Sequence, residues 1–232
     1  EGFGAGTTAV RARVMNYAPK PLSSVTVYWK IDGVDQTPKT FTGLDIKPNQ
    51  YLDLNMGTFF FYNKTPLGPF TVEVYTQSPN GVADENAAND KYTGGIGPSL
   101  TAGIYYAGGS AAHFTSPAEA ASYLNSSGVF GGGTVVIEVR PGTYNGQIIF
   151  NNPLANSNQV VFRSSTGKSY DVNIVNSPST ANNFVVQLAN VMNVSFQKMT
   201  FQNNNSNASN AGRVVIADNV NGLEFDQVVF NG

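Results

Sequence analysis

Two carboxylates near the C-terminus, Glu224 and Asp226, have the residue type and the spacing that sugar hydrolysis uses. They flank Phe225 in an alternating segment, so a β-strand would place both side chains on the face opposite the phenylalanine. Because a strand rises about 3.3 Å per residue, the two side chains would lie about 6.5–7 Å apart. That separation is typical of inverting glycosidases, in which one carboxyl group acts as acid and the other as base. The competing interpretation is the polar outer face of a strand, without a catalytic role.

The segment that contains these carboxylates repeats the segment before it. Residues 190–201 align without a gap on residues 219–230, and we call this pair of segments the C-terminal repeat. Phe196 and Phe225 share one slot and should point inward, in register, whereas Ser195 and Glu224 share the next slot and should point outward. The slots of Glu224 and Asp226 hold Ser195 and Gln197 in the earlier copy, so no carboxylate cluster builds up from coil to coil. This favours the non-catalytic interpretation.

A repeat period of about 20–50 residues predicts a solenoid, in which each coil buries its apolar face against the next. Apolar triplets that begin at Val135, Val160, Val185 and Val214 recur at nearly even intervals, each of about the length of one coil. We predict that these triplets are equivalent strands of successive coils. Shorter strands are predicted between them, at residues 148–150, 172–174, 194–196 and 223–225.

One helix is predicted, over residues 115–124, from a serine N-cap, a proline in the first turn and a run rich in alanine. This helix followed by the segment Gly133–Tyr144 resembles the opening of pectin-lyase-like right-handed parallel β-helices. The resemblance implies a β-helix over residues 98–232 whose N-terminal end is capped by the helix. Nothing after Phe230 would cap the last coil, so we expect further coils or another protein to cover it.

The resemblance to β-helices does not carry an activity with it. The Asp-Asp and Gly-His-Gly patterns of polygalacturonases are absent, and so are the Arg-Pro-Trp and Asp-centred strand motifs of pectinesterases. A lyase would need a basic residue near Ca²⁺-binding acids; Arg163, Lys168 and Asp171 are the nearest match, and a solvated turn explains them as well. The single histidine, His113, has no Ser or Asp of triad character beside it, which argues against histidine-based acid–base catalysis.

Residues 1–97 are predicted to form an antiparallel sandwich. Short alternating segments, such as Val10–Val14 and Val25–Ile31, are separated by turn residues about every ten positions, and Gly94–Pro98 is typical of a linker. The order and spacing of several short motifs resemble the CARDB domain, an immunoglobulin-like module of bacterial surface and secreted proteins that is linked with cell adhesion. These motifs are Asn16, Ile31-Asp32-Gly33, Gly43-Leu44, Pro48-Asn49-Gln50, Gly68–Val72 and Asp84–Asp90. Asn49 stands where the family usually has glycine, and asparagine tolerates the same backbone conformation.

The acidic end of this segment is a candidate Ca²⁺ site. Asp84, Glu85 and Asp90, with Asn86 and Asn89, place hard oxygen ligands close together in the sequence. Ca²⁺ takes six to eight such oxygens from flexible loops. The spacing does not match an EF-hand, and a hydrogen-bonded turn without metal is the alternative that we favour, so no cofactor is predicted.

Four consecutive aromatic residues, Phe59, Phe60, Phe61 and Tyr62, are too many for one buried face of a strand. One side should be core and the other should contact the solenoid. Alternatively, Phe59, Phe60 and Tyr62 form a platform on which a sugar ring stacks.

Composition limits the partners. The net charge is −2, with 13 basic and 15 acidic residues, so there is no electrostatic footprint for nucleic acid or an anionic membrane. No apolar run approaches the roughly 20 residues that span a bilayer, and the absence of cysteine rules out disulfides and thiolate metal sites. Abundant Gly, Asn, Val, Thr, Phe and Tyr predict a chain built from strands and tight turns.

Together these observations predict an all-β chain: an immunoglobulin-like sandwich followed by the first coils of a right-handed parallel β-helix. We expect a structural and adhesive segment of a large secreted or cell-surface bacterial protein, extracellular and consistent with type IX secretion. Its partners would be other domains or surface proteins, and polysaccharide. The alternative function is part of a polysaccharide lyase, esterase or glycosidase whose active site lies on later coils.

Overall fold

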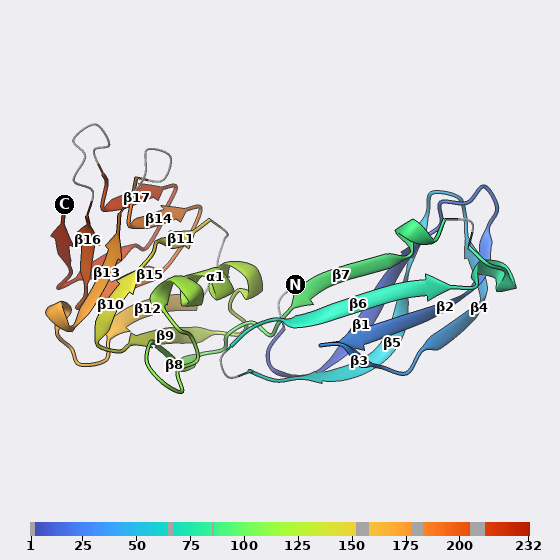
Figure 1. The fold of residues 1–232 in the computed structure, drawn as a ribbon, viewed down its shortest axis with the longest axis horizontal. Coiled ribbons are helices and arrows are strands. Elements are labelled where there is room, and N and C mark those ends of the chain that lie inside the picture. The colour runs from blue at the N-terminus through green and yellow to red at the C-terminus, as the bar shows by residue number, and fades with distance from the viewer. Residues whose placement is uncertain (1–2, 65–66, 85, 152–157, 178–182, 205–211) are drawn as a thin grey trace. The chain divides into compact units, whose positions relative to one another are not determined.

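The chain is built mostly from strands, which confirms the predicted all-β class (Figure 1). In a computed structural model, the described residues are 3–64, 67–84, 86–151, 158–177, 183–204 and 212–232. They contain one α-helix, α1 (Pro117–Ser127), and none of them forms an apolar helix of the length that a bilayer crossing requires.

Two compact units divide the chain. The first contains Ala5–Tyr62 and Pro69–Gly97, and the second contains Pro98–Gly232 with Glu1–Gly4 and Asn63–Gly68. Main-chain hydrogen bonds hold the two short segments in the second unit. The N–H of Ser99 donates to the carbonyl of Phe3 (2.7 Å), and the N–H of Leu67 donates to the carbonyl of His113 (2.6 Å). Nothing in the sequence pattern predicted that these segments belong with the second unit.

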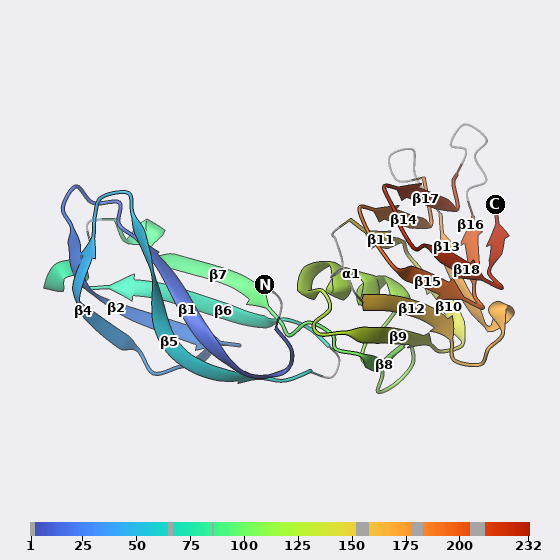
Figure 2. The ribbon, with the colours of Figure 1, turned by 180° about the vertical axis from the view of Figure 1, so that it is seen from behind.

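The first unit has two antiparallel sheets, one in front of the other (Figure 2). One sheet pairs β1 (Gly6–Met15) with β5 (Tyr51–Phe61). The other has the order β3-β2-β6-β7, and β4 also pairs with β2. Its strands are β2 (Leu22–Ile31), β3 (Val34–Asp35), β4 (Lys39–Ile46), β6 (Phe70–Gln77) and β7 (Lys91–Ile96). Period-two alternation builds the core, because Val25, Val27, Trp29 and Ile31 of β2 are buried at every second position.

Asparagine residues hold the turns of this unit. The side chain of Asn16 is buried at the end of β1; its Nδ2 donates to the carbonyls of Lys20 and Ile46 (both 2.8 Å), and its Oδ1 accepts the N–H of Ala18 (3.0 Å). The side chain thus joins the turn of residues 16–20 to the end of β4, and all its hydrogen-bonding atoms have partners. Asn49 has φ 60°, the left-handed conformation for which the resembled family uses glycine.

Parallel sheets form the second unit (Figure 1). Three of them have the orders β18-β15-β12-β9-β8, β10-β13-β16-β19 and β11-β14-β17. From β9 onward, successive strands along the chain therefore visit each sheet in turn, and each coil lies in register on the one before. The strands are β8 (Gly103–Ala107), β9 (Gly133–Val139), β10 (Gly142–Asn145), β11 (Ile148–Phe150), β12 (Asn158–Ser164), β13 (Val172–Asn176), β14 (Val186–Ala189), β15 (Val194–Gln197), β16 (Thr200–Asn203), β17 (Val215–Asp218), β18 (Glu224–Asp226) and β19 (Val229–Asn231).

The helix α1 covers the core of the first coil. Ser116 is its N-cap and accepts the N–H of Glu119 (3.1 Å), Pro117 is its first residue, and Gly128 ends it at φ 68°. Tyr123 and Leu124 are buried in the core, and α1 packs against β11 and β9. The helix is displaced toward the C-terminus from the predicted span 115–124, because Thr115 and Ser116 supply the cap.

The predicted strand register of the C-terminal repeat is confirmed, and the two copies also share their backbone conformation. Phe196 pairs with Phe225 and Phe201 pairs with Phe230 across neighbouring coils. The rings of Phe196 and Phe225 stack, with centroids 5.6 Å apart and planes 14° apart. Three residues with positive φ recur at the same offset. The pairs are Asn190 and Asn219 (56° and 49°), Asn193 and Gly222 (57° and 69°), and Lys198 and Gln227 (55° and 51°).

The predicted equivalence of the four apolar triplets is confirmed for the first two and for the last two, but it is wrong between the second and the third. Val135 pairs with Val160, but Val160 pairs next with Val194 rather than with Val185. Val186 lies in a different sheet, between Ile148 and Val215. An apolar triplet has the same appearance in every sheet of a coil, so spacing alone assigned Val185 and Val214 to the sheet of Val160.

Ser195 differs from the expectation in its exposure. It pairs with Glu224 on the outer face, as predicted, but only 1% of its surface is exposed, and its hydroxyl accepts a hydrogen bond from Nε2 of Gln197 (3.2 Å). Glu224 is exposed. The outer face of this sheet therefore contains buried as well as solvated positions.

Replacing Phe196 by alanine should destabilise the second unit by about 3–5 kcal/mol, because Phe196 is fully buried between Phe162 and Phe225. Phe225→Ala should cost less, since Phe225 is only partly buried. Urea unfolding followed by circular dichroism reports both units, whereas fluorescence of Trp29, the single tryptophan, reports the first. Only the circular-dichroism transition should move. Glu224→Ala is the control on an exposed slot, and an effect equal to that of Phe196→Ala would contradict the stacked core.

Asn16→Ala and Asn16→Asp should both lower the stability of the first unit by about 2–4 kcal/mol, because each removes the donor from a buried hydrogen bond to the carbonyl of Ile46 and from a partly buried one to the carbonyl of Lys20. Aspartate has nearly the shape of asparagine but lacks the NH₂ donor. The measurement is urea unfolding followed by Trp29 fluorescence. An Asn16→Asp variant as stable as the original chain would show that the donated hydrogen bonds contribute little.

Candidate functional site

The predicted catalytic carboxylates lie on β18, at the last strand of the five-stranded parallel sheet. Glu224 is exposed and Asp226 is half-buried, and they are opposite Ser195 and Gln197, as the repeat predicted. Asp226 lines a depression of about 380 Å³ with Glu138, Arg163 and Lys198 among its other residues. Acidic and basic side chains are thus interleaved on this outer face.

A column of paired residues explains that interleaving. Glu138, Arg163, Gln197 and Asp226 occupy successive strands of the sheet at one level. The guanidinium of Arg163 forms an ion pair with Glu138, with nitrogen and oxygen 2.5 Å apart. Glu138 and Arg163 therefore act as a cross-strand pair.

Arg163, Lys168 and Asp171, the weak match to a lyase, do not form a common site in the described contacts. Asp171 accepts a hydrogen bond from the hydroxyl of Thr166 (2.6 Å), and Lys168 lies near the ring of Tyr170. These contacts close the turn between β12 and β13.

His113 has a structural environment. Its Nδ1 accepts the N–H of Tyr106 (3.0 Å), and its ring stacks on that of Tyr106 with centroids 5.8 Å apart. Burial lowers the pKa of His113, and the nearby charge of Arg140 lowers it further. The neutral imidazole is therefore the favoured form, with Nδ1 used as an acceptor.

The four aromatic residues at the end of β5 divide between two faces. Phe61 is buried, and Phe59 and Phe61 pack edge-to-face on each other and on Phe70. Phe60 points to the opposite face and is 61% exposed, while Tyr62 packs on Phe70. Phe59, Phe60 and Tyr62 therefore do not line up as a single flat platform.

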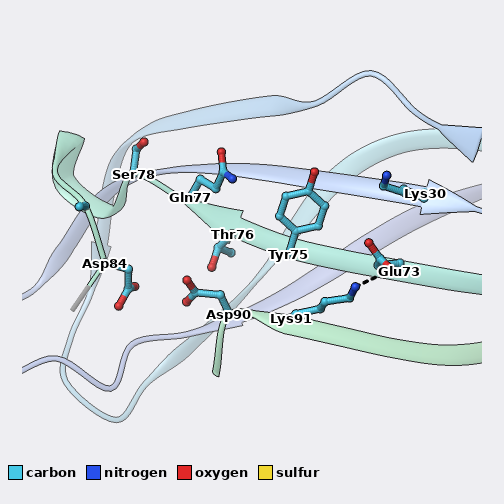
Figure 3. Close-up of a pocket in the computed structure, with 10 residues that line it drawn as sticks. Lys30, Glu73, Tyr75, Thr76, Gln77, Ser78, Asp84, Asp90 and Lys91 are labelled. Carbon is cyan, nitrogen blue, oxygen red and sulfur yellow. Dashed lines mark ion pairs between the residues drawn. The ribbon is translucent and has the colours of Figure 1, made fainter. Parts of the chain in front are cut away.

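Two of the candidate Ca²⁺ residues, Asp84 and Asp90, line a second depression, on the outer face of the five-stranded antiparallel sheet (Figure 3). Its volume is about 580 Å³. Asp84 and Asp90 point toward one another across one end of it, and Glu85 lies outside the described residues. The lining residues are Lys30, Glu73, Tyr75, Thr76, Gln77, Ser78, Ala83, Asp84, Asp90 and Lys91.

The two aspartates interact as like charges. Partial burial raises the pKa of Asp90, and the neighbouring carboxylate of Asp84 raises it further, while a hydrogen bond with Thr76 opposes the shift. The carboxylate of Asp84 also accepts the N–H of Asn86 (2.7 Å), as in a capped turn. Among the described residues, no three carboxylate, histidine or cysteine side chains are grouped so as to hold a metal ion.

Tyr75 supplies an aromatic surface to the same depression. One face of its ring stacks on Tyr28, its cross-strand partner, with centroids 5.1 Å apart and planes 7° apart. Lys91 forms an ion pair with Glu73 (2.7 Å). Sequence reasoning missed Tyr28 and Tyr75, although the alternation in β2 already placed Tyr28 outward. Their contact depends on the register of β2 with β6, which are far apart in sequence.

Searches with this chain found no matching protein-family model, no matching curated protein and no matching solved structure.

Replacing Asp90 by asparagine should raise the melting temperature at pH 7. The pKa of Asp90 in the folded chain lies above its ordinary value of 3.8. The protonated carboxyl, which predominates below pH 3.8, therefore favours the folded state. The contribution is lost as pH rises through the folded pKa. At pH 7 the ionised pair opposes folding; asparagine removes the repulsion and retains an acceptor for Thr76. Thermal melts at pH 7 and pH 3.5 should show the gain mainly at pH 7. Asp45→Asn, in an exposed pair with Lys47, should show none.

The same melts with CaCl₂ and with EDTA test the metal hypothesis. Bound Ca²⁺ at 100 times its dissociation constant would add about 2.7 kcal/mol. We expect no difference between the two conditions. A Ca²⁺-dependent gain that disappears in Asp90→Asn would contradict the capped-turn interpretation.

Proposed function

We propose that this chain is a non-catalytic, structural and adhesive segment of a secreted or cell-surface bacterial protein. In this proposal the first unit is an immunoglobulin-like module of the CARDB type, and the second is the first part of a right-handed parallel β-helix. The two-sheet antiparallel arrangement and the in-register parallel coils support these assignments. A stack of coils is suited to a spacer, because its length grows with each coil while its cross-section stays constant.

The depression lined by Tyr75 is the observation that carries the adhesive role. Sugar-binding surfaces combine an aromatic ring, which packs on the apolar face of a pyranose, with polar groups that bind its hydroxyls. Tyr75 provides the ring; Asp84 and Asp90 provide acceptors, and Lys30 and Lys91 provide donors. Three carboxylates against two ammonium groups line this depression, which disfavours acidic polysaccharides there. We therefore assign it to neutral or amine-bearing polysaccharide.

The enzyme alternative places the active site on later coils. The candidate carboxylates within this chain, Glu224 and Asp226, lie on an outer face, where Asp226 lines a depression with Lys198 and Arg163. Support for the non-catalytic function comes from the ion pair that neutralises Glu138 and from the structural contacts of His113. The full chain is expected to release no reducing ends, unsaturated products or methanol from pectin, polygalacturonate or alginate. Turnover that is lost in Glu224→Gln or Asp226→Asn would support the enzyme instead.

Affinity electrophoresis in xyloglucan, chitosan and polygalacturonate tests the binding function. Retardation is expected in xyloglucan or chitosan but not in polygalacturonate. Tyr75→Ala should weaken it roughly tenfold, since an aromatic contact is worth about 1.4 kcal/mol. Tyr51→Ala, an exposed tyrosine on the other sheet, is the matched control. Equal retardation of the original chain and Tyr75→Ala would contradict the assignment.

A further inference from the structure

The two sheets of the first unit differ in width, and part of the core-facing side of the wider sheet is uncovered. Register identifies this side. Tyr92 of β7 is level with Val74 of β6 and with buried Trp29 of β2. In the same way, Ile96 is opposite buried Phe70. Side chains at the same level of neighbouring strands point to the same face of a sheet, so Tyr92 and Ile96 face the core side.

The exposed fraction of the side chain rises sharply from the central strands to β7, even between residues that lie side by side in the sheet. Trp29 is 4% exposed and Phe70 is 1% exposed, whereas Tyr92 is 66% and Ile96 is 39% exposed. Val72 and Val74, between them on β6, are half-buried. The ring of Tyr92 lies over Gly94 of its own strand, and its hydroxyl fills the space that a Cβ at this glycine would take. We call Val72, Val74, Tyr92 and Ile96 the uncovered strip.

The narrower sheet, formed by β1 and β5, has a free strand edge on β1. Among the described residues, β1 pairs only with β5, so its other edge has no ladder partner along the length of the strand. Unpaired backbone N–H and C=O groups at strand spacing are a template for another strand. In Figure 2, β1 and β5 cross in front of the wider sheet, and β7 extends beyond β1.

We propose that an extended segment of a partner polypeptide adds to the free edge of β1 as a third strand and covers the uncovered strip. The backbone edge selects an extended peptide, by the mode called β-augmentation. Alternate side chains of the incoming strand would point toward Val74 and Tyr92 and should be apolar.

Charge specifies the other face of the partner. Arg13 of β1 has an acidic neighbour, since its guanidinium binds both carboxylate oxygens of Asp53 on β5 (2.7 and 2.8 Å). Arg11, two positions earlier and on the same outward face, is opposite Asn55. An acidic residue on the incoming strand beside Arg11 would complete this level, because opposite charges on neighbouring strands stabilise their pairing.

The same charges disfavour a second copy of this chain as the occupant. Pairing β1 with its equivalent would bring the exposed Arg11 and Arg13 of two copies together. Among the described residues β7 pairs only with β6, and its other edge carries exposed Lys91, which would also place a basic residue against β1. Like charges on paired strands are destabilising, so the partner is an acidic, alternating segment of a different sequence.

The test uses the full chain and a fluorescent nonapeptide, Thr-Val-Asp-Val-Glu-Val-Asp-Val-Thr, blocked at both ends. Fluorescence anisotropy should give a dissociation constant of about 100 μM or lower. Methylation of the amide nitrogens in the central part of the peptide should abolish binding, because it removes the backbone donors. Tyr92→Lys and Arg11→Glu should each weaken binding at least tenfold, and a peptide with lysine at the acidic positions should restore binding to Arg11→Glu. Phe60→Lys changes a residue of similar exposure on the outward face and should have no effect.

Absence of binding at about 1 mM peptide would overturn the proposal. So would equal binding of the methylated peptide, or equal losses in Tyr92→Lys and Phe60→Lys. Light scattering of the chain alone tests whether a second copy occupies the edge. A dimer that Tyr92→Lys dissociates would assign the edge to that second copy and overturn the acidic-peptide partner. Circular dichroism of each variant confirms that the losses come from a folded chain.

Discussion

Stacking in register is the constraint on which the second unit depends. One coil of three short strands has too few residues to enclose a core, so each inward side chain must be buried by its equivalents on neighbouring coils. The series Phe162, Phe196 and Phe225 meets this requirement with ring stacks 5.5 and 5.6 Å apart. A shift of one residue would turn these rings outward. Turn positions must therefore recur as strictly as apolar ones, and positive φ recurs at matching positions of the two copies of the C-terminal repeat.

That constraint separates the residues that maintain the stack from those that remain available for binding. Outward positions vary between coils: Ser195 is replaced by Glu224, and Gln197 by Asp226. Even there, Arg163 is used to neutralise Glu138 on the next strand. The first unit has no stacked coils, so the outward residues of its wider sheet do not have to match a repeat. Tyr75, Lys91 and the pair of aspartates can therefore line a common depression.

The two units solve the problem of sheet edges differently. In the second, each internal strand has a neighbour on both sides, and α1 packs on the first coil. In the first, a two-stranded sheet lies against a wider one, so burial is nearly complete at Trp29 and incomplete at Tyr92, although both are at the same level. Asn16 joins the turn after β1 to the end of β4 through its side-chain hydrogen bonds.

The sequence by itself determined the all-β class, the helix and the register of the C-terminal repeat, because each depends on a pattern of residue types along the chain. Tertiary structure alone decided which sheet each apolar triplet joins, since Val160 and Val186 have the same local pattern in different sheets. It also decided the burial of Ser195, the stacking of Tyr28 on Tyr75 and the approach of Asp84 to Asp90. These features depend on which distant strands become neighbours. Local patterns specify which face of a strand is apolar, but only the pairing of strands specifies what that face meets.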